Sequence, residues 1–187
     1  MPADSAARQR LFVAIPCPLT SNIQHALDEL RAAQRDAASG LRVVDAATLH
    51  ITLSFLGSVT VDRITQLQAA LDNLHTLPAP QLVLEGVGHF SSALWLGVAP
   101  NPALAKLAAR CDASLRALGF ELEERPFHPH VTLARLNPRP GFDCKAWCRT
   151  HRDTRWVEFA ADRVLLYRSE TFPEGARYSV IHTVTLR

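Results

Sequence analysis

The sequence predicts a mixed α+β fold, and three of its features support this prediction. Short segments rich in β-branched and apolar residues alternate with helix-length segments in which apolar residues recur every three or four positions. The two kinds of segment follow one another too irregularly for a doubly wound parallel sheet. One strand-like segment also occurs twice, with its histidines at positions 50 and 130, so we expect two similar lobes with one copy in each.

The predicted strands are short apolar runs that end at proline, glycine or an Asn-Pro pair. Gly57 is expected to close the third of them. In chain order, the expected strands are Arg10–Pro16, Val43–Val44, Leu49–Leu56, Gln81–Val87, Ala93–Val98, His130–Leu136, Val157–Tyr167 and Arg177–Leu186.

Three longer helices are predicted from apolar residues at helical spacing that follow a capping residue. Thr20 or Ser21 can cap a helix that continues to about Asp36, and Asn101 can cap one that opens at Pro102 and ends before Gly119. A further helix fits residues 61–74. Residues 137–155 are expected to be rich in loops, with one short helix around position 144.

The composition indicates a globular protein without an extreme charge. Hydrophobic residues make up 48% of the 187 residues, and the net charge of +2 is too small for a protein that coats nucleic acid. The longest apolar runs have the length of strands, so no membrane-spanning helix is expected. The first ten residues do not resemble a secretory signal, and nothing in the sequence calls for more than a cytoplasmic monomer.

The four cysteines, Cys17, Cys111, Cys144 and Cys148, form neither a C-x-x-C pair nor a regular disulfide framework. We therefore expect reduced thiols, as is usual in the cytoplasm. A zinc site would need more ligands at better spacing.

The repeated segment consists of Leu49–Gly57 and Pro129–Asn137. Each copy contains His, a β-branched apolar residue, Thr, Leu, a small residue, a variable residue and then Leu. Because side chains alternate between the two faces of a strand, the histidine and threonine of each copy point the same way. The apolar residues between them point to the opposite face and can enter a core. Two such strands facing one cleft would offer it two imidazoles and two hydroxyls.

Two imidazoles beside a phosphate suit the opening of a cyclic phosphodiester. This reaction needs a base that takes a proton from water and an acid that protonates the departing sugar oxygen, and histidine can serve in either role near neutral pH. Threonine hydroxyls can donate hydrogen bonds to the phosphate oxygens, and no metal or cofactor is required. A single His-x-Thr segment is ordinarily a half-exposed strand face, but two copies in matched contexts favour a shared site.

The paired motifs resemble those of the two-histidine (2H) phosphoesterase superfamily, and in detail its RNA 2′,3′-cyclic phosphodiesterase branch, historically called 2′-5′ RNA ligases (the LigT/ThpR type). The matching segments are Arg10–Ile15, Leu49–Gly57, Leu94–Gly97, Arg125–Arg135, Tyr167–Ser169 and Gly175–Tyr178. The resemblance implies one domain over residues 1–187, with two intertwined lobes related by a pseudo-two-fold and two antiparallel sheets around a central cleft. It implies hydrolysis of the 2′,3′-cyclic phosphate at an RNA end to a 2′-phosphate.

The resemblance also implies roles for individual residues. His50 and His130 would be catalytic, with His50 as the proton donor and His130 as the proton acceptor, although the sequence alone does not assign these roles. Thr52 and Thr132 would bind the substrate. The position of Phe12 implies contact with the nucleobase, but Val13 stands where the family often has a second aromatic residue.

Arg135 matches an arginine that contacts phosphate in the same family. It lies five residues after His130, so strict alternation would turn it away from the cleft. A bulge or a strand end near Ala134, or the length of the arginine side chain, would bring its guanidinium back to the phosphate. The first copy has Phe55 at the equivalent position, so the two halves are not chemically equivalent.

Other functions are compatible with these residues. His128 and His130 have a spacing that metal ligands use, so a metallohydrolase is an alternative, although no carboxylate–histidine cluster completes such a site. A non-catalytic module that binds RNA or a nucleotide is a second alternative. Reversible ligation of a 2′,3′-cyclic phosphate to a 5′ hydroxyl is a third, because it uses the same acid–base pair.

Partners are expected to be RNA ends or small cyclic nucleotides, with no membrane. A basic segment formed by Arg149, His151, Arg152 and Arg155 could guide RNA to the cleft, or could be an ordinary solvated loop.

Overall fold

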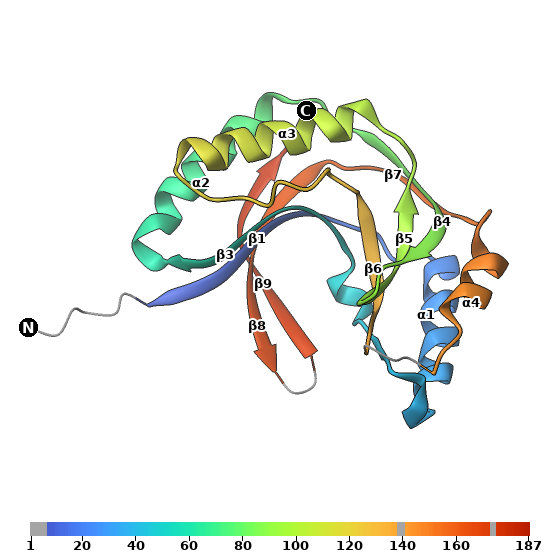
Figure 1. Cartoon of the computed structure of the whole chain (residues 1–187). Helices are drawn as coiled ribbons and strands as arrows, with labels where there is room; N and C mark the ends of the chain where they lie inside the picture. The colour runs from blue at the N-terminus through green and yellow to red at the C-terminus, as the bar shows by residue number, and fades with distance from the viewer. Residues whose placement is uncertain (1–6, 138–140, 173–174) are drawn as a thin grey trace, which may run out of the picture.

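The computed structural model describes residues 7–137, 141–172 and 175–187. Within these residues nine strands form one antiparallel sheet that curls into an arch, with helices along its outer side (Figure 1). The strands are β1 (Arg8–Pro16), β2 (Leu41–Val43), β3 (His50–Thr60), β4 (Gln81–His89), β5 (Ala93–Val98), β6 (His130–Leu136), β7 (Arg155–Ala160), β8 (Arg163–Phe172) and β9 (Gly175–Thr185).

The helices are close to their predicted positions. They are α1 (Ser21–Gln34), α2 (Ile64–Asp72), α3 (Pro102–Ala117) and α4 (Cys144–His151). The predicted helix over residues 61–74 is a composite, because short 3-10 turns at Val61–Arg63 and Asn73–Thr76 flank α2. None of the helices in the described residues is both long enough and apolar enough to cross a bilayer.

The two motif strands occupy the middle of the sheet. The strand order is β7-β4-β5-β6-β3-β1-β8-β9, with β2 also paired to β6, so three strands of this order lie outside each motif strand. The α+β prediction is confirmed, and the two predicted sheets are the two halves of one continuous sheet. These halves join through a single residue pair between β3 and β6, formed by Ile51 and Val131.

Each half of the sheet is covered by a helix that follows a strand of the other half. Helix α1 leaves β1 and packs against β2, next to α4, which packs against β4. Helix α3 leaves β5 and packs against β3, next to α2. This exchange interlocks the two halves, because neither half can bury its outer face without a helix from the other.

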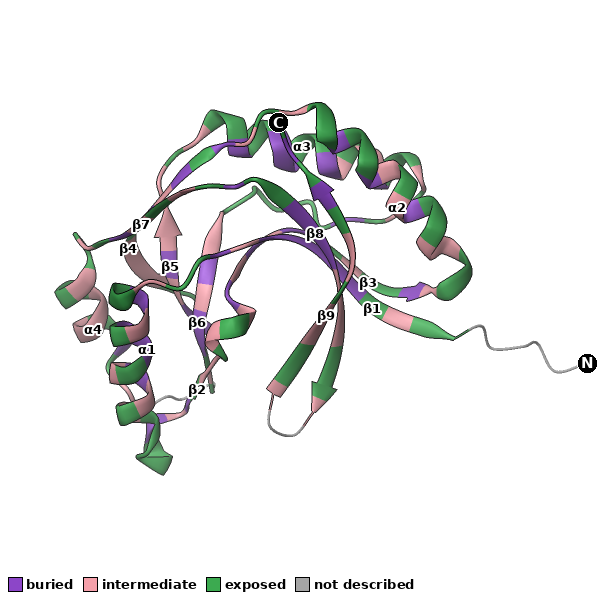
Figure 2. Cartoon of the chain, turned by 180° about the vertical axis from the view of Figure 1, so that it is seen from behind, coloured by how far each residue is buried: buried purple, intermediate pink, exposed green. Residues whose placement is uncertain are grey.

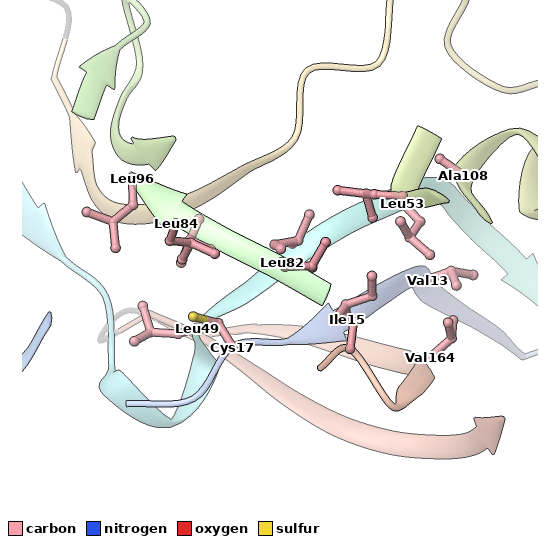
Figure 3. Close-up of a cluster of buried hydrophobic side chains, with 14 of the residues drawn as sticks. Val13, Ile15, Cys17, Leu49, Leu53, Leu82, Leu84, Leu96, Ala108 and Val164 are labelled. Atoms are coloured by element: carbon pink, nitrogen blue, oxygen red, sulfur yellow. The ribbon is translucent and has the colours of Figure 1, made fainter. Parts of the chain in front are cut away.

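The two long helices have clear sequence reasons to form. The Thr20 hydroxyl accepts a hydrogen bond from the Ile23 amide at 3.4 Å, and the Asn101 side chain accepts one from the Leu104 amide at 2.9 Å. Pro102 occupies the first turn of α3, where no amide donor is needed. Buried residues lie on the sides of α1 and α3 that face the sheet (Figure 2). Side chains from β1, β3, β4 and β5 meet in the resulting core (Figure 3).

Two strand predictions were wrong. Gly57 does not end β3, because its φ of 67° allows a bulge opposite β1 and the strand continues to Thr60. The predicted strand Val157–Tyr167 is two strands, because the chain turns at Ala161–Asp162. Here β7 leaves its partner β4 at one edge of the sheet, and the chain crosses to pair β8 with β1 in the other half. The sequence gives little indication of this turn, because apolar residues precede and follow it closely.

Truncating the residue that joins the two halves should destabilise the whole protein. Ile51 and Val131 are both fully buried, and replacing a buried isoleucine with alanine removes packing worth about 2–5 kcal/mol. We therefore expect Ile51→Ala to lower the free energy of unfolding in urea by that amount. The control is Val180→Ala, at a strand position 50% exposed, which should change it by less than about 0.5 kcal/mol. Equal effects of the two substitutions would contradict this account of the junction.

Candidate active site

The motif strands present their histidines and threonines on the inner side of the arch. In β3, His50 and Thr52 are half-buried, whereas Ile51 between them is fully buried in the core. The second motif in β6 repeats the same alternation residue by residue. The core therefore holds the backs of both strands, and their polar fronts lie side by side because the strands pair at Ile51 and Val131.

A bulge at the same place in both strands interrupts this alternation. Thr132 pairs with Trp95 and Ala134 with Leu94, so Leu133 is skipped in the register. Leu133 and Ala134 are consecutively buried, and Arg135 then returns to the exposed front face. The predicted bulge near Ala134 is confirmed.

The bulge in β3 skips Leu53 in the same way. It brings Phe55, the counterpart of Arg135, to the front face with 60% of its surface exposed. Equivalent bulges in the two strands thus place the Arg135 guanidinium on the front face of β6 and the Phe55 ring on the front face of β3.

The two imidazoles are anchored by identical hydrogen bonds. Nδ1 of His50 lies 2.6 Å from the carbonyl oxygen of Thr48, and Nδ1 of His130 lies 2.8 Å from that of His128. A carbonyl can only accept, so each Nδ1 carries the proton and donates it. Nε2 of each ring is therefore the nitrogen left to accept a proton, or to deliver one once the ring is protonated.

The environment keeps both histidines neutral at neutral pH. Burial is the main cause that lowers the pKa of each below 6.5, and the carbonyl bonds oppose it. The positive charge of Arg135 lowers the pKa of both rings further. His130 additionally lowers the pKa of His50, and His128 lowers that of His130. Arg135 is thus electrostatically coupled to both imidazoles.

A pocket of about 440 Å³ opens beside the first motif. His50, Thr132 and Arg135 line it, whereas His130 and Thr52 do not. Its other walls come from residues 42–48 and from the β8–β9 hairpin. The lining residues outside the motifs are Arg42, Val43, Val44, Asp45, Thr48, Thr171, Gly175, Ala176, Arg177 and Tyr178.

Aromatic rings surround His50 on the side away from His130. The Phe12 ring stacks on Tyr167 with a centroid distance of 5.0 Å, and its edge meets Tyr178 at 4.9 Å. Phe12 also lies 5.0 Å from the His50 ring and is only 3% exposed. Neighbouring rings therefore cover Phe12, which packs against His50, and its expected contact with the nucleobase stays a prediction.

Comparison with known proteins assigns the family. A model described as the 2′-5′ RNA ligase superfamily matches residues 19–171. The chain belongs to this superfamily. An RNA 2′,3′-cyclic phosphodiesterase of Methanocaldococcus jannaschii is 30% identical over 182 residues, 92% of this chain and 98% of the relative. A protein of the same name from Escherichia coli K12 is 34% identical over 144 residues, 72% of this chain and 80% of the relative.

The fold is similar to that of solved structures. The structure of E. coli LigT complexed with 3′-AMP has a TM-score of 0.73 and 30% identity, covering 96% of this chain and 99% of that one. A structure described as TT0787 of Thermus thermophilus has the same TM-score at 27% identity, covering 95% and 98%.

The second motif has an aromatic flank of its own. Phe90 meets the His130 ring edge-on at 5.2 Å, and Trp95 lies 5.1 Å from the His128 ring. The backbone carbonyl of His128 anchors His130, as described above. Among the described residues, no three or more histidine, cysteine, aspartate or glutamate side chains converge on one point.

The basic segment runs from the last turn of α4 to the start of β7 and lies apart from the pocket. Arg152 pairs with Asp153 at 2.9 Å, and Arg155 pairs with Glu158 across the start of β7. His151 is held by Glu29 of α1 at 3.0 Å. None of these residues lines the pocket beside His50. The predicted loop is therefore partly helical, and carboxylates of the protein itself pair with His151, Arg152 and Arg155.

Four residues of the site have no role predicted from the sequence. Arg42, Arg177 and Tyr178 line the pocket, and Phe55 is exposed on the motif face. The position of Phe55, five residues after His50, was a usable signal because Arg135 follows His130 by the same interval. Arg177 and Tyr178 lie in a segment that matched the superfamily. No sequence pattern indicated Arg42, because only the pairing of β2 with β6 places it beside the site.

Removing the charge of Arg135 should raise the pKa of both motif histidines. Arg135→Gln deletes a positive charge that disfavours both imidazolium ions. NMR titration of the imidazole signals should therefore show both values moving up towards 6.5. Arg163→Gln makes the same charge change on β8 outside the pocket and should leave both values unchanged. Titration curves identical to wild type in Arg135→Gln would contradict the coupling.

Proposed function

We propose that the protein hydrolyses the 2′,3′-cyclic phosphate at an RNA end to a 2′-phosphate, by metal-independent acid–base catalysis with two histidines. The observation that carries this proposal is the matched anchoring of His50 and His130 on two paired strands, which leaves Nε2 of each ring available for proton transfer, with an arginine-lined pocket beside His50. The shared name of the M. jannaschii and E. coli relatives supports the choice of substrate. In this proposal residues 1–187 form one domain of two intertwined lobes.

The proposed reaction divides the two proton transfers between the histidines. Nε2 of His130 takes a proton from water as the water oxygen attacks phosphorus. The bond from phosphorus to the 3′ oxygen breaks, and the Nε2 proton of His50 passes to that oxygen, leaving the phosphate on the 2′ oxygen. Resemblance to the superfamily supports this assignment of roles. The pocket beside His50 supports it too, because the leaving 3′ oxygen belongs to the bound nucleoside.

The anionic substrate can supply the protonation state that this mechanism needs. Without substrate, burial and Arg135 favour the neutral form of both rings. A phosphate in the cleft brings a negative charge that raises the pKa of a neighbouring imidazole and offsets Arg135. One ring, His50 in our proposal, then holds the proton that the leaving group requires, while the other stays neutral as the base.

Arg135 and the two threonines are proposed to bind the phosphate oxygens. Thr132 and Arg135 both line the pocket and share the front face of β6 with His130. A guanidinium offers paired donors that match a phosphate, and hydroxyl donors stabilise the charge that develops on its oxygens. Thr52 has the matching place on β3. We also propose that the enzyme works as a monomer in the cytoplasm, and its four free cysteines support that location.

The function is tested with adenosine 2′,3′-cyclic phosphate and with an RNA oligomer bearing the cyclic end, both in excess chelator. Wild type should form the 2′-phosphate. His50→Ala and His130→Ala should each lose about 10²–10⁴-fold in kcat, the usual contribution of a positioned acid or base. His25→Ala, an exposed position on α1, is the control.

Three other results would replace this function with another. Activity that disappears in chelator would favour a metallohydrolase. Saturable binding without turnover would favour a binding module. A product joined to an added 5′-hydroxyl oligomer, in excess over the hydrolysis product, would favour ligation.

The Thr132 hydroxyl provides a separate test of transition-state stabilisation. Thr132→Val keeps the shape of the side chain but removes the donor. We expect kcat to fall about 10²-fold, as when one donor to a developing oxyanion is lost. Thr183→Val, at an exposed position on β9, is the matched control and should leave kcat unchanged. A loss confined to KM would instead assign Thr132 to ground-state binding.

A further inference from the structure

The two motif histidines are anchored alike, but the carbonyls that anchor them are held differently. Nδ1 of His50 donates to the carbonyl of Thr48, the last residue of a 3-10 turn at Ala46–Thr48. Nδ1 of His130 donates to the carbonyl of His128, which lies in a segment outside any helix or strand. The orientation of the His50 ring therefore depends on a folded turn, whereas that of His130 does not.

Asp45 closes this turn with both its side chain and its main chain. Its Oδ1 accepts a hydrogen bond from the Ala47 amide at 2.9 Å, which makes an Asx turn. Its main-chain carbonyl accepts the Thr48 amide at 2.9 Å and the Thr48 hydroxyl at 2.7 Å. A 3-10 turn of three residues has few hydrogen bonds of its own and poorer geometry than an α-helix. The bonds to Asp45 therefore determine where the Thr48 carbonyl points.

The turn is fixed at both ends to strands of the sheet. Before the turn, the Val44 amide donates to the carbonyl of Leu133 at 2.9 Å, at the bulge of β6. After the turn, the carbonyl of Leu49 accepts the Cys17 amide at 2.9 Å, just past the end of β1. Since both ends are held, the conformation between them is the part of this segment that Asp45 controls.

The bond to Thr48 is also an electrostatic influence on His50. Burial is the main cause that lowers the pKa of His50, and the Thr48 carbonyl opposes it. Arg135 and His130, both on β6, lower that pKa further. The other rings around His50 are aromatic side chains of β1, β8 and β9, namely Phe12, Tyr167 and Tyr178. A weaker bond to the carbonyl would thus favour the neutral ring.

We propose that Asp45 is a positioning residue for His50. By capping the turn, it directs the Thr48 carbonyl at Nδ1, which keeps the proton of the neutral ring on Nδ1 and leaves Nε2 free. Asp45 acts through Thr48 and makes no contact with the reacting atoms. The catalytic meaning of this inference rests on the proposed function, in which Nε2 of His50 delivers the proton to the leaving oxygen.

An NMR titration of the histidines tests the inference without turnover. Asp45→Ala should lower the pKa of His50 and increase the share of its tautomer protonated on Nε2, while His130 keeps its wild-type values. Asp45→Asn retains the Oδ1 acceptor without the charge and should restore both signals. The matched control is Asp36→Ala. It removes a cap of the same length, 2.9 Å, from the 3-10 turn at residues 37–39 outside the pocket, and should change neither ring.

The pH dependence of kcat for adenosine 2′,3′-cyclic phosphate tests the catalytic consequence. In the proposed mechanism His50 must be protonated, so kcat falls as the pH rises through its pKa in the enzyme–substrate complex. Asp45→Ala should move this alkaline limb to lower pH and reduce kcat about tenfold along it, because a misplaced catalytic group loses rate steeply. The acidic limb, set by His130, should stay where it is.

Several results would overturn the positioning role. An unchanged pKa and tautomer of His50 in Asp45→Ala would show that the cap does not hold the ring. Equal effects of Asp45→Asn and Asp45→Ala would show that the carboxylate acts through its charge, since Asp45 also lines the pocket. Equal effects of Asp36→Ala and Asp45→Ala on His50 would reduce the result to lost stability. A loss confined to KM would assign Asp45 to substrate contact.

The inference stays testable if Asp45→Ala does not fold. Thr48→Val then removes only the hydroxyl bond to the Asp45 carbonyl and should shift His50 in the same direction by a smaller amount; an unchanged ring overturns the inference. Its control is Thr76→Val, because Thr76 makes the same hydroxyl-to-carbonyl bond in the turn at residues 73–76. If wild type hydrolyses no cyclic phosphate, the proposed function fails, and the NMR titration still decides whether Asp45 positions His50.

Discussion

The pairing of Ile51 with Val131 determines how the two motifs of the candidate site lie relative to one another. It is the single contact between β3 and β6 in the sheet register, and both side chains are fully buried. Since the faces of a strand alternate, a slip of one residue in either strand would send its histidine into the core and an apolar side chain into the cleft. The hydrophobic effect therefore holds the two imidazoles in register. The carbonyl bonds at Nδ1 then fix which nitrogen each ring presents.

The bulge that follows each motif adds a third functional position to the same face. Strict alternation offers a strand only every second residue, so a site that uses positions one, three and six requires an irregularity. Both motif strands contain it at the same offset, after the Leu that packs into the core. The adjacent buried pairs Leu53–Ser54 and Leu133–Ala134 hold it in place. Burial of these side chains thereby determines which residues of each motif strand face the front, both before and after the bulge.

The sequence was sufficient for those parts of the fold that depend on local pattern. The bounds of β6 and the front faces of both motifs followed from apolar alternation, and the caps of α1 and α3 from their side chains. The sequence was not sufficient where the structure depends on pairing between strands that are far apart in the chain. The break at Ala161–Asp162 exists because β7 and β8 pair with strands in different halves of the sheet. Phe12 could be placed on β1, but only the pairing of β1 with β8 covers its ring with Tyr167.

The difference between the two halves is as important chemically as their similarity. Two histidines in identical surroundings would titrate alike, whereas the proposed reaction needs one proton donor and one acceptor at the same pH. The shared backbone arrangement supplies two matched imidazoles, and the side chains around them break the symmetry. Arg135 stands in one half where Phe55 stands in the other, and His128 lies beside His130, where it lowers the pKa of that ring. Repetition of one strand thus provides the geometry, and divergence at a few positions allows the two copies to take opposite roles.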